Sequence, residues 1–399
     1  MTTNALCTLE EAQAKIASGG RLLLAGDEHV LRQLPRGTWI GGTIPYFMAA
    51  QGGTHSTDHV FVTELPPEAT VNSIRFYGVD KLPSITTDAA DNGFTVIIIP
   101  AGSDAHQVYA KEAGTYPGLF LTPIVGWIAG VAVEDIGRVK PLVFNGATGE
   151  TSADAAVVLH ASLPADSFAR IEMVNLFRPG SGSRITFPTA SFEVGTCIVD
   201  GMADNFARWL TEHQVDTRLP LVANYCGAMV NTSIQAVDPA AGTVGLYAPV
   251  FPGIEYVVAE PIGDYAAEFN KAVARKTIEP TFACNCILNY LYGELEGRQT
   301  GDVTGPITFG EIAYQLLNQT MVYLSVRPMP INLSRHVAQV PVPTAPVAAA
   351  AAAAPVVPVV AAAPVAPAAP VRPAVAAAPH DANFLKRFGH AMSGLFGRR

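Results

Sequence analysis

The sequence is short of charged residues and of cysteines, and each shortage excludes a class of protein. Charged residues make up 15% of the 399 residues and hydrophobic residues 49%, which is the balance of a globular protein. The five cysteines are odd in number and irregularly spaced, so they do not form the disulfide framework of a small secreted protein. The N-terminus lacks the charged and apolar regions of a secretory signal. We therefore expect a cytoplasmic protein with reduced thiols.

Positive charge is scarce in most of the chain. Residues 341–399 contain five Lys or Arg and one Asp, a net charge of +4, which leaves a net charge of −13 on residues 1–340. Proteins that bind nucleic acids carry their basic patch on the folded domain. We therefore expect no nucleic-acid partner, and an acidic body with a separate basic attachment element.

Familiar catalytic and metal-binding motifs are missing as well. The sequence has no G-x-S-x-G nucleophile motif and no H-E-x-x-H motif. His55, Asp58 and His59 lie close together, but no second cluster completes a metal site, so turn chemistry is the better interpretation. The loop at 180–183 lacks the Lys-Ser/Thr ending of a phosphate-binding loop and predicts a hairpin turn. We expect neither a metal nor a cofactor.

The apolar pattern predicts a mixed α/β (α+β) body with mixed sheets. Thr8 is the expected N-cap of a helix that ends at Gly19-Gly20. The continuous apolar run 94–100 predicts a strand that is covered on both faces. Further helices are expected at 202–213, 264–275 and 284–295, and a hairpin at 243–262. Because the elements do not follow a strict βαβ rhythm, we predict two lobes, residues 1–165 and 166–330.

A Pro/Ala-rich segment, 331–380, separates this body from the C-terminal end. It is uncharged over 346–371, so it resembles a membrane span by hydropathy alone. Its repeated prolines would break a helix and leave backbone groups unsatisfied in lipid. The composition therefore predicts an extended, disordered linker.

The last segment, 381–399, has apolar residues at helical spacing and basic residues mostly off that stripe. Asp381 is the expected N-cap, and Gly389, Gly394 and Gly397 each weaken the helix by about 1 kcal/mol relative to Ala. We therefore predict an amphipathic targeting helix that forms on contact. It would bind an anionic membrane surface, a partner protein or assembly, or the body of its own chain. The long linker argues against the last of these. The main residues of the predicted targeting helix are Phe384, Leu385, Lys386, Arg387, Phe388, Met392, Leu395 and Phe396.

Cys284-Asn285-Cys286 places two cysteines one residue apart. A structural zinc site needs about four ligands, and the other cysteines lie far away in sequence. The redox motif is C-x-x-C, which this is not. Cys284 could be a nucleophile if a helix N-terminus or a histidine lowered its pKa. Burial as a small core side chain is the simpler interpretation.

Three stretches of the second predicted lobe resemble the C-terminal half of the FIST family: 246–273, 281–295 and 305–326. The resemblance depends on Phe282-Ala283-Cys284, on Gly310-Glu311-Ile312 and on the polar segment Asn318-Gln319-Thr320. It covers about 80 residues, and the match to the N-terminal half of the family is weaker. The family pattern often has Gly-Arg after the cysteine, where this chain has Asn285-Cys286.

The resemblance implies a sensory domain that binds a small ligand, as in bacterial signalling proteins and some eukaryotic adaptors. It would place Cys284, Asn285, Gly310 and Glu311 near a ligand pocket or the lobe interface. Asn285 could donate and accept hydrogen bonds, Glu311 could bind an amino group, and Gly310 would permit close backbone approach.

We therefore expect a non-catalytic sensor or binding module for a small ligand. Its C-terminal helix would tether it to a membrane surface or a protein assembly. The alternatives are a thiol-dependent enzyme that uses Cys284 and is delivered by the tail, and an adaptor whose body binds a protein. A buried thiol without a lowered pKa would favour the sensor over the enzyme.

Overall fold

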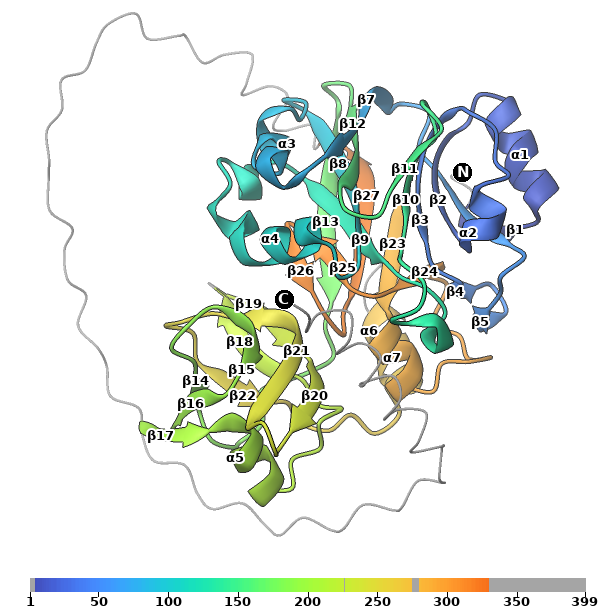
Figure 1. Cartoon of the computed structure of the whole chain (residues 1–399). Coiled ribbons are helices and arrows are strands. Elements are labelled where there is room, and N and C mark those ends of the chain that lie inside the picture. The colour runs from blue at the N-terminus through green and yellow to red at the C-terminus, as the bar shows by residue number, and fades with distance from the viewer. Residues whose placement is uncertain (1–3, 226, 275–279, 330–399) are drawn as a thin grey trace, which may run out of the picture.

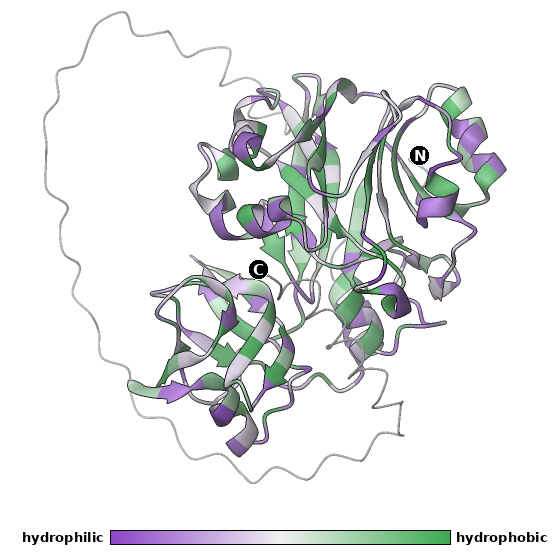
Figure 2. Cartoon of the chain, viewed as in Figure 1, coloured by the Kyte–Doolittle hydropathy of each residue, from purple (hydrophilic) through white to green (hydrophobic). Residues whose placement is uncertain are grey.

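The computed structural model describes residues 4–225, 227–274 and 280–329 (Figure 1). It confirms the mixed α+β class, with several mixed sheets and short helices. The predicted linker, 331–380, and the predicted targeting helix, 381–399, lie outside the described residues. Figure 2 shows that the central strands of the body are predominantly hydrophobic, whereas helix α4 (Asp104–Glu112) carries hydrophilic residues.

The first sheet contains two parallel strands and is covered by two helices. Ala12 and Ile16 of α1 share a hydrophobic cluster with Leu22 and Leu24 of β2, whereas Leu23 belongs to the central core on the other side of the sheet. Thr8 caps α1 in a capping box, as the sequence predicts. The elements are α1 (Leu9–Ala17), α2 (Glu28–Leu31), and, in spatial order, β1 (Asn4–Cys7), β6 (Val60–Glu64), β2 (Arg21–Gly26), β3 (Thr38–Thr43), β10 (Val143–Asn145) and β11 (Glu150–Ser152).

The second sheet supplies the centre of the body. Strand β8 is buried along its whole length and contacts both β3 of the first sheet and β13 of the third, which explains its continuous apolar sequence. The strands in spatial order are β26 (Gln315–Leu317), β25 (Glu311–Ala313), β9 (Ile124–Ala129), β8 (Gly93–Pro100), β12 (Ala156–Ser162) and β7 (Thr70–Tyr77). Helices α3 (Ser84–Thr87) and α4 (Asp104–Glu112) belong to the same part of the chain, with 3-10 turns at Val79–Lys81, Ala113–Thr115, Leu119–Leu121 and Val133–Asp135.

The third sheet joins strands from the two ends of the body. Strand β24 pairs with β4 from the N-terminal part and lies parallel to β23. The strands in spatial order are β13 (Ser167–Val174), β27 (Met321–Pro328), β23 (Phe282–Cys286), β24 (Gly305–Thr308), β4 (Tyr46–Ala49) and β5 (Gly52–His55), with helices α6 (Tyr265–Ala274) and α7 (Ile287–Tyr292). Since the second and third sheets both combine strands from before and after residue 165, the predicted division at 165/166 does not separate the sheets.

A smaller β module is inserted between β13 and α6. We call the described residues between 185 and 258 the inserted module; they have a hydrophobic core of their own that includes Phe206 and Tyr256. Figure 1 shows the module as a distinct group of strands beside the body. One sheet has the order β17 (Met202–Asn205), β16 (Thr196–Val199), β14 (Ile185–Thr186), β22 (Tyr256–Val258), β18 (Leu221–Tyr225) and β19 (Ala228–Thr232), and the other has β15 (Ser191–Val194), β21 (Thr243–Val250) and β20 (Ile234–Asp238), with helix α5 (Phe206–Glu212).

Four sequence predictions about local structure are wrong. Residues 180–183 do not form a hairpin turn, since β13 pairs with β27 whereas β14 pairs with β16 and β22. Residues 284–286 belong to strand β23, and the helix begins only at Ile287, because the central core favours an extended apolar segment there. Strands β21 and β22 do not form a hairpin, since each pairs with other strands of the module. Residues 202–205 form strand β17, and Asn205 caps the helix that follows.

Candidate functional site

Strand β23 carries both cysteines of the C-x-C sequence into the core. Cys284 and Cys286 are 1% and 0% exposed, and the Cys284 thiol donates to the Gly126 carbonyl at 3.5 Å. Burial raises the pKa of both thiols well above the ordinary value, and the nearby Glu311 carboxyl adds to this effect. Neither thiol is therefore activated as a nucleophile.

Asn285 lies between the two cysteines and faces helix α7. Its side-chain Oδ1 accepts hydrogen bonds from Asn289 Nδ2 at 2.9 Å and from the Cys286 backbone N–H at 2.8 Å. The Asn289 amide also donates to the Thr320 carbonyl at 3.4 Å. The amide of Asn285 thus connects the end of the strand to the first turn of the helix rather than reaching into an open pocket.

Glu311 begins strand β25 and is fully buried. Its Oε2 accepts hydrogen bonds from the Thr320 backbone N–H at 3.2 Å and from the Thr320 hydroxyl at 2.8 Å. Burial raises the pKa of this carboxyl to about 8, against the opposing effect of Thr320 and of the Cys286 thiol. The side chain therefore holds a proton at neutral pH.

Gly310 allows two strands to approach closely beside this carboxyl. A Cβ atom at this position would lie 3.0 Å from side-chain carbons of Ile128 and Leu316. The Gly310 carbonyl accepts from the Ile128 N–H at 2.8 Å and from the Thr308 hydroxyl at 3.1 Å. The role of Gly310 in this structure is therefore to allow close packing between strands.

The four residues singled out from the sequence belong to one buried polar cluster. We use this name for Cys284, Asn285, Cys286, Asn289, Thr308, Gly310, Glu311 and Thr320. Within the described residues, Asn285 Nδ2, Asn289 Oδ1 and Glu311 Oε1 have no N–H, O–H or carbonyl partner. A cavity of about 10 Å³ adjoins Cys284 and Asn285, which is room for about one water molecule. The resemblance thus points to residues that come together, but they lie in the core.

Two larger cavities lie elsewhere, at the carboxyl ends of parallel strands. The pairs β2–β3 and β8–β9 are both parallel, and the residues after these strands form much of the cavity walls. One cavity has a volume of about 290 Å³ and the other about 330 Å³. Val139 and Lys140 line both, so we treat the two as one cleft, the strand-end cleft. Neither cavity is lined by Gly310 or Glu311.

The two halves of the strand-end cleft differ in charge. The smaller half contains Arg138, Lys140 and Asp154, whereas the larger contains Asp27, Glu28 and Asp135 as well as Arg32 and Lys140. The smaller half is walled by Ala101, Gly102, Ser103, Gly137, Arg138, Val139, Lys140, Pro141, Ala153 and Asp154. The larger half is walled by Asp27, Glu28, His29, Arg32, Thr43, Ile44, Pro45, Gly130, Val131, Ala132, Asp135, Val139 and Lys140.

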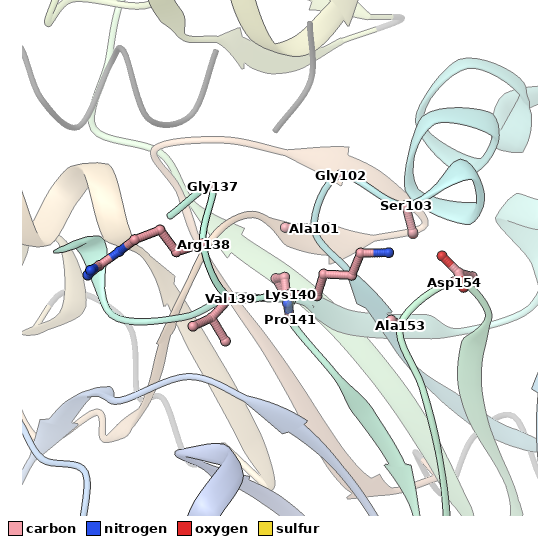
Figure 3. Close-up of a pocket in the computed structure, with 10 residues that line it drawn as sticks. All are labelled: Ala101, Gly102, Ser103, Gly137, Arg138, Val139, Lys140, Pro141, Ala153 and Asp154. Carbon is pink, nitrogen blue, oxygen red and sulfur yellow. The ribbon is translucent and has the colours of Figure 1, made fainter. Parts of the chain in front are cut away.

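Lys140 is the cation of this cleft that remains available to a ligand. Arg138 is paired with Asp135 at 2.7 Å and Arg32 with Glu28 at 2.6 Å, whereas Lys140 forms no salt bridge in the part of the chain that the structure describes. Figure 3 shows its ammonium group pointing toward Ser103 and Asp154, while the Arg138 side chain extends the other way. The smaller half of the cleft can therefore offer a positive charge to an anionic group.

The strand-end cleft was missed by sequence reasoning, although part of its signal is visible. Asp27 directly follows the buried strand β2 and Ser103 comes three residues after the end of β8, and each is an N-cap that caps its helix through its side chain. Ligands in α/β sheets commonly bind at such strand ends. No feature of the sequence around Lys140 marks it, because the loop reaches the cleft only through the tertiary fold.

The remaining sequence-predicted groups contribute no site. His59 Nδ1 lies 2.9 Å from the Ser56 hydroxyl, which is turn chemistry as expected. Residues 4–225, 227–274 and 280–329 contain no group of three His, Cys, Asp or Glu placed to hold a metal ion. Within the same ranges no helix has the length and hydrophobicity to cross a bilayer.

Comparison with known proteins gives a family but no function. No curated protein and no solved structure matches the chain. One family model does match, over residues 7–327, and its description is a family of unknown function, DUF6976. The matched region covers the body and the inserted module and ends before the Pro/Ala-rich segment. The chain therefore belongs to DUF6976, a family of unknown function.

Proposed function

We propose that this chain is a non-catalytic module that binds a small ligand in the strand-end cleft. The ligand carries an anionic group, which lies against Lys140 in the smaller half of the cleft. The observation that carries the proposal is a lysine that forms no salt bridge within residues 4–225, 227–274 and 280–329, on the wall shared by two adjoining cavities of about 290 and 330 Å³. Cavities of this size suit a small organic molecule.

Asp154 narrows the chemistry of that ligand. Figure 3 shows its carboxylate beside the Lys140 ammonium group. A ligand with several negative charges would be repelled by this carboxylate, whereas a ligand that also has a hydroxyl or amino donor would be accepted. We therefore favour a small carboxylate with a neighbouring hydrogen-bond donor.

Thiol-dependent catalysis at Cys284 is not our proposal. The thiol is buried and its pKa is raised, so the thiolate that would attack a substrate is disfavoured. The resemblance of 246–326 to the FIST family supports ligand sensing as the purpose of binding. We place the ligand at Lys140 rather than at Cys284, Asn285, Gly310 and Glu311, because those four residues are closed off in the core.

Ligand binding at Lys140 can be tested by thermal unfolding of the full chain with acetate, glycolate and inorganic phosphate. A ligand at ten times its Kd stabilises the folded state by about 1.4 kcal/mol, which raises Tm. We expect the largest rise with glycolate, and we expect Lys140→Gln to abolish it. Lys81→Gln is the matched control, since Lys81 is exposed and outside the cleft. Equal shifts in both variants, or no shift with any of the three compounds, would contradict the proposal.

We further propose that residues 381–399 tether this module, from a cytoplasmic location, to a membrane surface or a protein assembly. A fluorescent fusion to residues 336–399 should localise in cells, and Phe384→Glu together with Phe388→Glu should make it diffuse by removing the apolar stripe. Binding of the fusion to anionic vesicles would assign the tether to lipid, and its absence to a protein partner. Diffuse fluorescence of the unmodified fusion would sink the tethering proposal.

A further inference from the structure

The inserted module is attached to the body through a buried polar segment, Asn318–Thr320. Asn231 of the module donates its side-chain amide to the Asn318 and Gln319 carbonyls at 3.2 and 3.3 Å. The Ser233 hydroxyl donates to Gln319 Oε1 at 2.7 Å, and Gln319 Nε2 donates to the Arg218 carbonyl at 3.2 Å. Gln319 has a φ of 48°, which is unusual for a residue with a side chain, so these hydrogen bonds help to hold a strained backbone.

The other side of this segment is held by the buried polar cluster. Glu311 Oε2 accepts both the backbone N–H and the hydroxyl of Thr320, and the Thr320 carbonyl accepts from the Cys286 N–H at 3.2 Å. Asn318–Thr320 is thus hydrogen-bonded to the inserted module on one side and to the buried polar cluster on the other. Any opening of the cluster around Glu311 would displace Thr320 and disturb the hydrogen bonds to the module.

Among the residues that the structure describes, no cation compensates the Glu311 carboxyl. The titratable groups that interact with it are Cys284 and Cys286 on β23 and Tyr265 on α6. All three are neutral at pH 7 and become negative when they ionise, and no lysine, arginine or histidine of the described residues contributes to the pKa of Glu311. An ionised Glu311 would therefore be a buried charge without a counter-ion, which is costly until water reaches it.

We propose that Glu311 is a proton-dependent latch, whose neutral carboxyl keeps the buried polar cluster closed and whose ionisation loosens the attachment of the inserted module at Asn318–Thr320. Hydrogen bonds from Thr320 favour the carboxylate, but they do not outweigh its desolvation in the closed cluster. An open arrangement admits water to the carboxylate, so ionisation shifts the balance toward it.

The direction of the pH dependence follows from proton binding. The folded carboxyl releases its proton at a pH of about 8, whereas an unfolded glutamate does so near 4.5. Between these values the folded chain holds more protons than the unfolded chain, so the stability that Glu311 contributes falls as the pH rises. Below pH 4.5 and above about pH 8 the contribution of Glu311 to stability changes little with pH.

The first test compares urea unfolding midpoints at pH 5 and pH 8.5 for the unmodified chain and for Glu311→Gln. Gln cannot ionise, so we expect the midpoint of the unmodified chain to fall further than that of the variant over this interval. Glu68→Gln is the matched control, because Glu68 is exposed and loses the same charge. A parallel pH dependence in the unmodified chain and in Glu311→Gln would overturn the latch.

A second test needs only the unmodified chain, so it remains decisive if Glu311→Gln does not fold. Backbone hydrogen exchange, corrected for the intrinsic pH effect, is measured at pH 6 and pH 8.5. We expect at least a threefold loss of protection at 229–233 and 318–320 at the higher pH. Equal protection of these segments at both pH values would overturn the latch.

Discussion

The buried polar cluster and the strand-end cleft differ in almost every property that bears on function. The cluster contains two of the five cysteines, Cys284 and Cys286, beside the fully buried Glu311, with space for about one water molecule. The cleft is lined by common residues and loops, yet it has room for a small molecule, and its Lys140 forms no salt bridge with any residue that the structure describes. Unusual residues and accessible cavities thus occur in different places.

The comparison shows that the residues of a conspicuous sequence motif can be buried as part of the hydrophobic core. Cysteine pairs and buried acids attract attention because their chemistry is reactive in water. In the interior the same groups are held neutral by desolvation, which raises the pKa of Cys284 and Glu311 alike. Binding requires access as well as chemistry, and only the cleft provides both.

The strongest test of this comparison is to remove an aromatic side chain beside the cluster. Phe282 is fully buried and stacks on Trp127 with a centroid distance of 5.4 Å. We expect Phe282→Ala to lower the free energy of unfolding by about 3–5 kcal/mol, measured by urea denaturation. Phe120→Ala is the matched control, since Phe120 is 63% exposed, and it should cost less than about 1 kcal/mol. Similar losses in the two variants would show that the cluster region is not a packed core.

A smaller effect is expected from a single polar contact in the cluster. Thr320→Val keeps the shape of the side chain but removes the hydroxyl that donates to Glu311 Oε2. We expect a loss of about 1–3 kcal/mol in the free energy of unfolding, because a buried acceptor loses a partner. The exposed Thr87 provides the control, and Thr87→Val should change stability by less than about 0.5 kcal/mol. A neutral Thr320→Val would mean that the cluster is already hydrated.

The smallest effect on stability belongs to the cleft. Lys140→Gln removes an exposed charge that forms no salt bridge among the described residues, so its free energy of unfolding should stay within about 0.5 kcal/mol of the unmodified value. The same variant should lose the ligand-induced rise in Tm. A large loss of stability of the Lys140→Gln variant without ligand would show that Lys140 has a structural role rather than a role in ligand binding.

Much of the fold could be predicted because local rules were sufficient for many elements. Thr8 and the two glutamates that follow it specify α1, and the apolar run of β8 specifies a doubly covered strand. The prediction for 284–295 was wrong at its start, since Cys284 lies in a strand whose pairing with β27 and β24 is non-local. The inserted module was missed for a similar reason, because its separate core is defined by contacts between strands far apart within 185–258.

The candidate site residues likewise could be predicted from the sequence only in part. The resemblance selected Cys284, Asn285, Gly310 and Glu311 from separate stretches, and these residues do come together in the structure. Their burial could not be predicted, because it depends on the packing of β25 against β23 and on Thr320. Lys140 could not be selected at all, since an exposed lysine in a loop has no distinguishing pattern.

The sequence by itself determined the mixed α+β class, the capped helices, the apolar strands and the division of charge between body and C-terminal end. These properties depend on residue composition and on spacings of a few residues. Only the tertiary structure decided that the C-x-C sequence is a core strand, that Glu311 keeps its proton, and that Lys140 meets two cavities. Each of those depends on desolvation and on contacts between residues far apart in the chain, which no local pattern encodes.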